Sequence, residues 1–164
     1  MYRGGVGEVV TPPSWLDSAL AACHVFQEST VLMISHICLG ITDYPRAFAF
    51  YARVMNALDL QLKFAEAERG WAGWVQRDTP RPIFVIGQPF DGAPATTGNG
   101  QMIALTARSR DQVDLAYRAA IEAGGQCEGV PGLRPHYHPD YYGAYFRDPD
   151  GNKLCVCCHA PPAT

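Results

Sequence analysis

The sequence has little charge and no long apolar run. Charged residues make up 18% of its 164 residues, with 13 Lys and Arg against 16 Asp and Glu, where about 25% is usual. A mildly acidic balance argues against nucleic-acid or anionic-membrane partners, which are bound through clustered basic residues. No apolar run reaches the roughly 18 residues of a membrane span. The sequence therefore predicts a protein with no nucleic-acid or membrane partner, and its low charge predicts a homodimer with covered surface.

Cysteine spacing excludes two further classes. The six cysteines form no even framework, and the one CxxC spacing, Cys155 to Cys158, has no second CxxC to match it, which argues against a disulfide scaffold and against a zinc ribbon. Free thiols of this kind are typical of a reducing compartment, so we expect a cytoplasmic protein.

Residues 1–32 are expected to form an N-terminal extension. The first 13 residues are rich in glycine and end in two prolines, the composition of a flexible arm. Apolar residues then recur at helical spacing and predict one short helix over residues 15–27. One interpretation is an appendage read from an early start codon, and the other is an arm that packs on a partner subunit through Trp15.

An internal repeat organises the rest of the chain. Residues 36–39 align with residues 102–105, and without a gap Tyr51 then falls on Tyr117. Each copy opens with an apolar strand, continues into an amphipathic helix and ends in short strands. The turn Asp148-Pro149-Asp150-Gly151-Asn152 predicts a hairpin between the last two strands. The sequence thus predicts an α+β domain over residues 33–160, with repeat one at 33–93 and repeat two at 98–160.

Several segments carry a family resemblance. They are Ser35-His36-Ile37, Phe50-Tyr51, Ala123-Gly124-Gly125, the stretch 131–144 with its core Pro-His-Tyr-His-Pro-Asp-Tyr-Tyr-Gly-Ala, and the turn 148–153. Together they resemble the vicinal oxygen chelate superfamily, which includes glyoxalase I, bleomycin-resistance proteins and extradiol dioxygenases. The long stretch is similar to a glyoxalase-like bacterial subgroup. The resemblance implies two β-α-β-β-β repeats that form an incompletely closed barrel.

The resemblance also implies a divalent metal, zinc, nickel or iron, held by a His that opens each copy and a Glu in the last strand. His36 occupies the first ligand position. Met102 and Cys155 replace the other two ligands, and the matching place in copy one is Phe84 or an apolar neighbour. A thioether is a poor ligand for zinc, nickel or iron, and one imidazole with one thiol leaves the ligand set incomplete, so we expect no tightly bound metal of this kind. By default Met102 and Cys155 are ordinary core residues, whereas a soft set of His36, Met102 and Cys155 would suit copper.

His36 and Cys155 are the candidate catalytic residues, because a nearby imidazole would favour the thiolate. Cys155, Cys157 and His159 share one strand face by alternation. Their spacing, about 6.6 Å between alternate residues, favours packed thiols over a metal cluster.

Candidate substrate-binding residues come from both copies. The loop before the third strand of copy two is stiffened by prolines, and Arg134 is a cation there that could pair with a carboxylate or phosphate. The complete set is Trp74, Phe84, Met102, Arg134, His138 and Tyr142.

Two functions from different classes follow. The first is a lyase or isomerase of the lactoylglutathione-lyase type, which moves a proton at a carbon next to a carbonyl of a small organic molecule. The alternative is a metal-free protein that binds or sequesters a small molecule such as a drug, in the manner of the bleomycin-resistance proteins.

Overall fold

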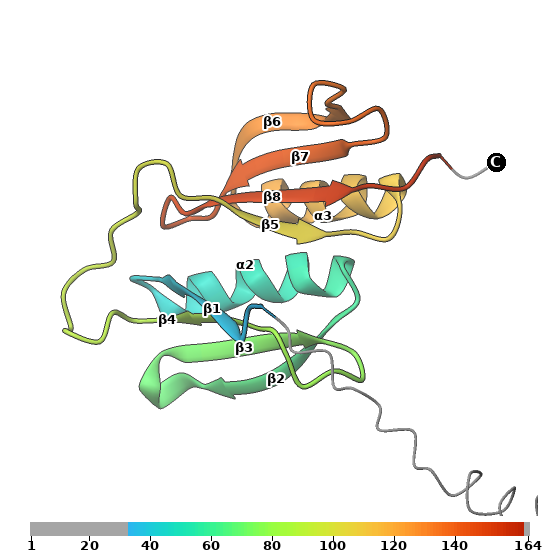
Figure 1. The fold of residues 1–164 in the computed structure, drawn as a ribbon. Coiled ribbons are helices and arrows are strands. Elements are labelled where there is room, and N and C mark those ends of the chain that lie inside the picture. The colour runs from blue at the N-terminus through green and yellow to red at the C-terminus, as the bar shows by residue number, and fades with distance from the viewer. Residues whose placement is uncertain (1–32, 163–164) are drawn as a thin grey trace, which may run out of the picture. The chain divides into compact units, whose positions relative to one another are not determined.

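The computed structural model describes residues 33–162, so the predicted extension 1–32 and its helix lie outside the described residues. These residues form two modules (Figure 1). The first contains β1 (His36–Gly40), α2 (Tyr44–Ala57), β2 (Leu60–Glu66), the short helix η1 (Ala67–Arg69), β3 (Trp71–Gln76) and β4 (Ile83–Gly87). The second contains β5 (Ile103–Thr106), α3 (Arg110–Glu122), β6 (Gln126–Leu133), β7 (Tyr142–Arg147) and β8 (Lys153–Cys158).

The modules repeat one sheet topology. The strand orders are β1-β4-β3-β2 and β5-β8-β7-β6, and in each sheet the first strand runs parallel to the last. The remaining neighbours are antiparallel. This confirms the predicted pair of β-α-β-β-β repeats. Within residues 33–162 no strand pairing joins the two sheets, so they do not close into a barrel.

Both helices begin where the sequence provides a cap. Asp43 accepts a hydrogen bond from the Arg46 backbone N–H at 3.0 Å, and Ser109 does the same for Gln112 at 3.2 Å. Each helix buries one stripe of side chains against its own sheet. Gly124, with a φ of 93°, follows the second helix as the predicted cap residue. Within the described residues, no helix is long and apolar enough to cross a membrane.

Strand alternation gives each sheet a helix-covered face and an open face. On the covered face, Trp74 and Phe84 pack around the ring of Tyr51. In the second module, Leu154, Val156 and Cys158 belong to the same buried core. The open face of the first sheet carries a small separate apolar cluster made of Val75, Ile83 and Val85, flanked by Phe64 and Trp71.

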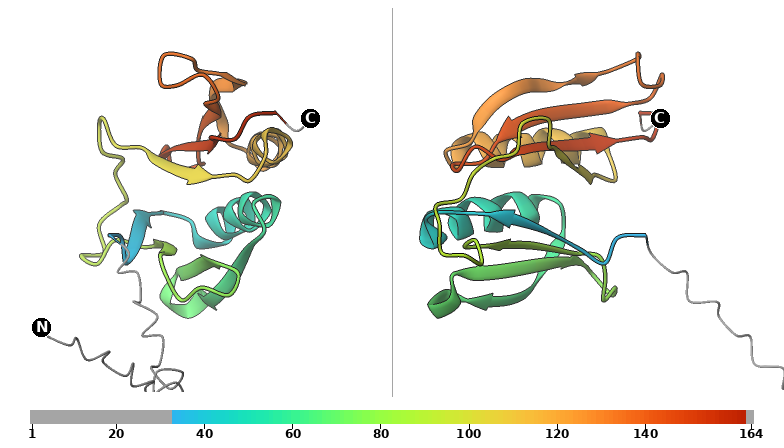
Figure 2. Two further views of the ribbon diagram at one scale, coloured as in Figure 1. Left: turned by 45° about the vertical axis from the view of Figure 1, so that its right-hand side comes forward. Right: turned by 60° about the vertical axis from the view of Figure 1, so that its left-hand side comes forward.

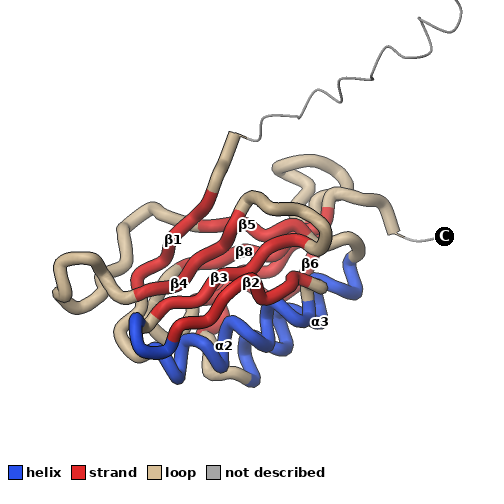
Figure 3. Tube along the Cα trace, turned by 90° about the horizontal axis from the view of Figure 1, so that it is seen from below, coloured by secondary structure: helices blue, strands red, loops and turns tan. Residues whose placement is uncertain are grey.

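The modules meet through their helices. Figures 2 and 3 show α2 and α3 side by side, and the contacts between the two helices agree. The Phe50 ring meets Phe146 with centroids 6.2 Å apart. Next to them the Tyr51 hydroxyl donates a 2.6 Å hydrogen bond to Asp148 in the other module. One buried core therefore spans both modules.

Asp148 is a buried carboxylate with a full set of donors. Its side chain also accepts from the backbone N–H groups of Asp150 and Asn152 and from the Asn152 amide, at 2.7–3.0 Å. The Asn152 amide reaches Gly40 O in β1 as well. Burial, together with the Asp148 carboxylate beside it, raises the pKa of Tyr51, so its hydroxyl stays a donor.

We predict that Tyr51→Phe lowers the free energy of unfolding by about 1–3 kcal/mol, since the change removes one donor from a buried carboxylate and leaves the ring in place. Urea denaturation of both proteins measures the difference. Tyr44→Phe on the same helix is the matched control and should change stability little, because Tyr44 is largely a packing residue. Equal midpoints for Tyr51→Phe and the wild type would contradict the prediction.

Candidate functional site

The open face of the second sheet carries a polar cavity of about 740 Å³. The loop before β5 forms one wall, and strands β6, β7 and β8 with the loop after β6 form the rest. The lining residues are Thr97, Gly98, Asn99, Gly100, Gln101, Met102, Glu128, Arg134, His136, Tyr137, Tyr145, Arg147 and Lys153. Met102 and Arg134, both predicted substrate-binding residues, thus line one cavity.

The cavity carries a net positive charge. Glu128 pairs with Arg147 at 2.6 Å and with Lys153 at 3.3 Å. Hydrogen bonds from these two side chains lower the pKa of Glu128, so the carboxylate stays ionised. Arg134 is fixed differently: it donates to Val130 O at 2.8 Å and to Leu133 O at 3.1 Å.

The Arg134 guanidinium also lies 5.6 Å from the centroid of the Tyr145 ring. Among the described residues, no carboxylate lies within ion-pair distance of it. Backbone carbonyls and an aromatic ring hold this cation in place, and its charge remains available to an anion in the cavity.

The residues at the family's metal-ligand positions do not form a hard-metal site. Cys38 of β1 pairs with Val85 and Ala104 of β5 pairs with Cys155. The counterpart of Cys155 in the first module is therefore Val85, one residue beyond Phe84. The four positions carry an imidazole, an alkyl group, a thioether and a thiol, so only two of them offer a ligand type that zinc, nickel or iron favours.

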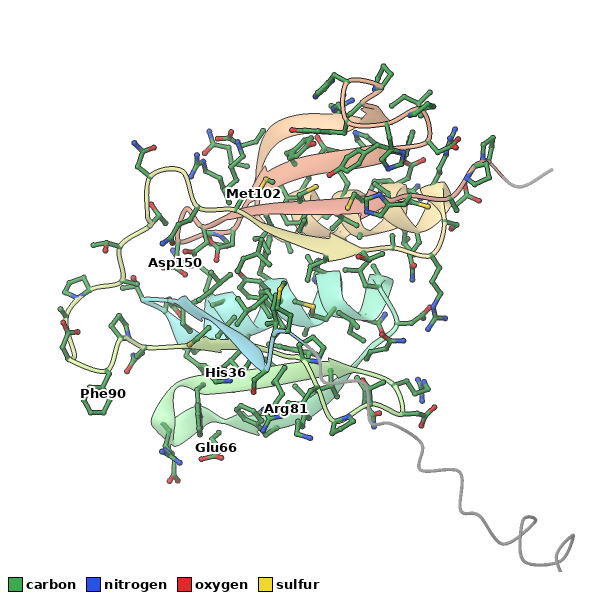
Figure 4. All side chains as sticks on the ribbon, viewed as in Figure 1. His36, Glu66, Arg81, Phe90, Met102 and Asp150 are labelled. Atoms are coloured by element: carbon green, nitrogen blue, oxygen red, sulfur yellow. The ribbon has the colours of Figure 1, made fainter. Side chains whose placement is uncertain are left out.

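His36 opens β1 and Met102 directly precedes β5 (Figure 4), and the His36 ring nitrogen Nδ1 lies 3.3 Å from the Ser35 hydroxyl. A smaller cavity of about 400 Å³ between β1 and β5 is lined by Cys38 and Met102 but not by His36. Across residues 33–162, no group of three or more His, Cys, Asp or Glu side chains is placed to hold a metal ion.

The predicted catalytic pair is not brought together either. The Cys155 thiol lies 3.6 Å from the Tyr141 hydroxyl, in the second module, while His36 contacts Ser35 in the first. Hydrogen bonding to Cys157, together with burial, raises the pKa of Cys155. Cys155 is therefore a thiol and not a thiolate in this setting.

Three of the predicted substrate-binding residues lie away from the open face. Trp74 and Phe84 point toward α2, because strand alternation places them with the core. Tyr142 donates a 2.9 Å hydrogen bond to Asp114 and so fastens β7 to α3. Its neighbour Tyr141 reaches the open face instead.

His138, predicted to bind substrate, belongs to a hydrogen-bonded cluster with His159 and Cys157. Its Nε2 lies 2.8 Å from Nδ1 of His159, whose Nε2 lies 3.7 Å from the Cys157 sulfur. Alternation along residues 155–159 predicted that these side chains share a face. The spacing of these residues did not show that the loop over residues 134–141 brings His138 to His159.

Comparisons with known proteins agree with this architecture. The Glyoxalase/Bleomycin resistance protein/Dioxygenase superfamily model matches residues 33–156. A glyoxalase/bleomycin resistance protein from Albidiferax ferrireducens T118 is 34% identical, with a TM-score of 0.70, over 77% of this chain and 99% of that one. No curated protein matches.

Two more distant solved structures share the fold. A family enzyme from Burkholderia phytofirmans PsJN is 21% identical, with a TM-score of 0.58, over 77% of this chain and 98% of that one. A glyoxalase-related enzyme from Fulvimarina pelagi is 19% identical, with a TM-score of 0.59, over 78% and 88%. The family model, the relative from Albidiferax and the paired β-α-β-β-β modules lead to one conclusion. The chain belongs to the glyoxalase/bleomycin resistance protein/dioxygenase superfamily.

Proposed function

We propose that this protein binds a small organic anion, a carboxylate or a phosphate ester, in the cavity of the second module, without a metal. The observation that carries the proposal is Arg134, a cation fixed at the cavity by backbone carbonyls and by Tyr145. Arg147 and Lys153 add two charges against the single Glu128. A guanidinium is suited to bidentate recognition of carboxylate or phosphate oxygens.

The rest of the cavity suits an organic ligand. Tyr137 and Tyr145 supply aromatic surface, and Asn99 and Gln101 supply amide groups at the opposite wall. Ligand sites in proteins commonly combine such apolar surface with a few fixed polar groups. We favour metal-free binding over the lyase or isomerase alternative. That reaction would need either a metal, two of whose family ligands are replaced here by Met102 and Cys155, or a contact between His36 and Cys155. Among the described residues no hydrogen bond joins these two side chains.

A thermal-shift screen tests the proposal. The panel contains small carboxylates and phosphate monoesters, each with its neutral amide or alcohol counterpart. A ligand at one hundred times its Kd stabilises the folded state by about 2.7 kcal/mol. Anions that raise the melting temperature while their neutral counterparts do not would support the proposal. Equal shifts for both, or no shift across the panel, would refute it.

For any anion identified in that screen, we predict that Arg134→Gln weakens binding by about 2 kcal/mol, or roughly thirtyfold in Kd, since a charge-assisted hydrogen bond is lost. Isothermal titration measures the change. Arg118→Gln is the matched control, because Arg118 is exposed on α3 and does not line the cavity. Equal losses in the two variants would contradict the assignment.

We also predict that the purified protein carries no stoichiometric zinc, nickel or iron at the position of His36. The replaced ligands give a donor set that binds hard divalent ions weakly. Elemental analysis of wild-type protein and of His36→Ala measures the metal content. A stoichiometric metal that is present in the wild type and missing from the variant would overturn this prediction.

The assembly we propose is a homodimer in the reducing cytoplasm. Exposed apolar side chains on the second module, Met102, Val130 and Leu133, support a covered surface, and the described cysteines are free thiols. Light scattering of the full chain is expected to give twice the 17.9 kDa chain mass. A monomer at micromolar concentration would contradict the dimer.

A further inference from the structure

A second group of reactive side chains lies on the open face of β8, outside the cavity. Cys155 and Cys157 point to this face, and His159 follows them. Gly143 of β7 pairs with Cys157. A Cβ atom at Gly143 would lie 2.9 Å from the Tyr141 ring, so the missing side chain is what allows this ring to lie over the strand beside the sulfur.

The direction of the hydrogen bonds through this group is fixed from one end. The Asp140 backbone N–H can only donate, and it donates to Nδ1 of His138 at 3.3 Å. A neutral His138 must then carry its proton on Nε2 and donate it to Nδ1 of His159, 2.8 Å away. His159 in turn carries its proton on Nε2, which faces the Cys157 sulfur at 3.7 Å. The sulfur is therefore the acceptor at the end of the chain.

The surroundings of this sulfur also favour its charged form. Hydrogen bonding with Cys155, with further contributions from Tyr141 and His159, lowers the pKa of Cys157 to about 6. The pKa values of Cys155 and Tyr141 are raised, so both keep their protons.

Among the described residues, the titratable groups around this sulfur come from three elements. They are Cys155 and His159 from β8 and the segment after it, His138 and Tyr141 from the preceding loop, and Tyr145 from β7, whose pKa is also raised. On the β5 side the paired residue is Thr106, which does not titrate. None of these groups is a carboxylate, so nothing facing Cys157 opposes a negative charge on its sulfur.

Access to this sulfur is narrow. Cys157 is only 3% exposed, and Tyr141 covers one side. On the other side β5 presents Ala104 and Thr106, two small and exposed residues. A reactant must therefore be small.

We propose that Cys157 is a nucleophilic, redox-modifiable thiolate whose substrate is a small hydroperoxide. The thiolate sulfur attacks one peroxide oxygen, an S–O bond forms and the O–O bond breaks. The sulfur is oxidised to a sulfenic acid while the peroxide is reduced, and the departing hydroxide takes a proton from solvent to become water. His159 contacts the reacting sulfur, and His138 is a positioning residue. This site is independent of the anion cavity.

The test uses the reduced full chain and hydrogen peroxide. Dimedone, the trap for sulfenic acid, is added in denaturant at each time point, so that the narrow access does not exclude it, and mass spectrometry locates the label. At pH 6 a thiol of pKa near 6 has roughly 150 times the thiolate fraction of an ordinary cysteine. Its lower intrinsic nucleophilicity reduces this advantage about tenfold. We expect labelling of Cys157 roughly tenfold faster than labelling of Cys127, which is exposed. Slower labelling of Cys157 would overturn the proposal.

Two variants test the histidine pair. His159→Phe should lower the labelling rate of Cys157 at pH 6 about tenfold and move the midpoint of its pH profile upward. His36→Phe is the matched control, because His36 is an exposed histidine of the first module with Ser35 as its neighbour, and it should leave the profile unchanged. If His159→Phe does not fold, the wild-type profile still decides: a midpoint near 6 supports the proposal, and one above about 8 refutes it.

Discussion

The buried carboxylate of Asp148 is the constraint on which the arrangement of the two modules depends. A buried charge is tolerated only when donors surround it, and here the donors come from its own turn and from Tyr51 in the other module. The same turn places Asp150 within 3.1 Å of Arg46 at the start of α2. One set of hydrogen bonds thus stabilises both the β7–β8 hairpin and the docking of the modules. The core between the two helices lies next to it.

Most of the fold could be predicted, because its signals are local or periodic. The repeat and the turn at residues 148–152 are each contained in short stretches, and each is present in the structure. The covered and open faces follow from alternation, but only when the starting residue is right. The place that matches Cys155 in copy one was predicted only as Phe84 or an apolar neighbour, and a shift of one residue along a strand moves a side chain to the opposite face. The register with β1 selects Val85.

The site was harder to predict because it depends on contacts between distant segments. Arg134 and Met102 were expected at a pocket and line one. The sequence placed Cys155, Cys157 and His159 on one face, but it did not show that His138 meets His159 across 21 residues of sequence. No periodic pattern contains that contact, and none shows that Tyr142 contacts Asp114 while Tyr141 contacts Cys155.

The meeting of the modules through their helices has a consequence for how such a protein changes over evolutionary time. Residues on an open sheet face contribute little to the shared core, so substitutions there cost little stability and leave the other module unaffected. The two copies here already differ in this way: one face carries an apolar and aromatic cluster, and the other carries cations, tyrosines and thiols. Duplication of one module thus gave this chain two surfaces that selection can alter separately, each on a scaffold that the other helps to stabilise.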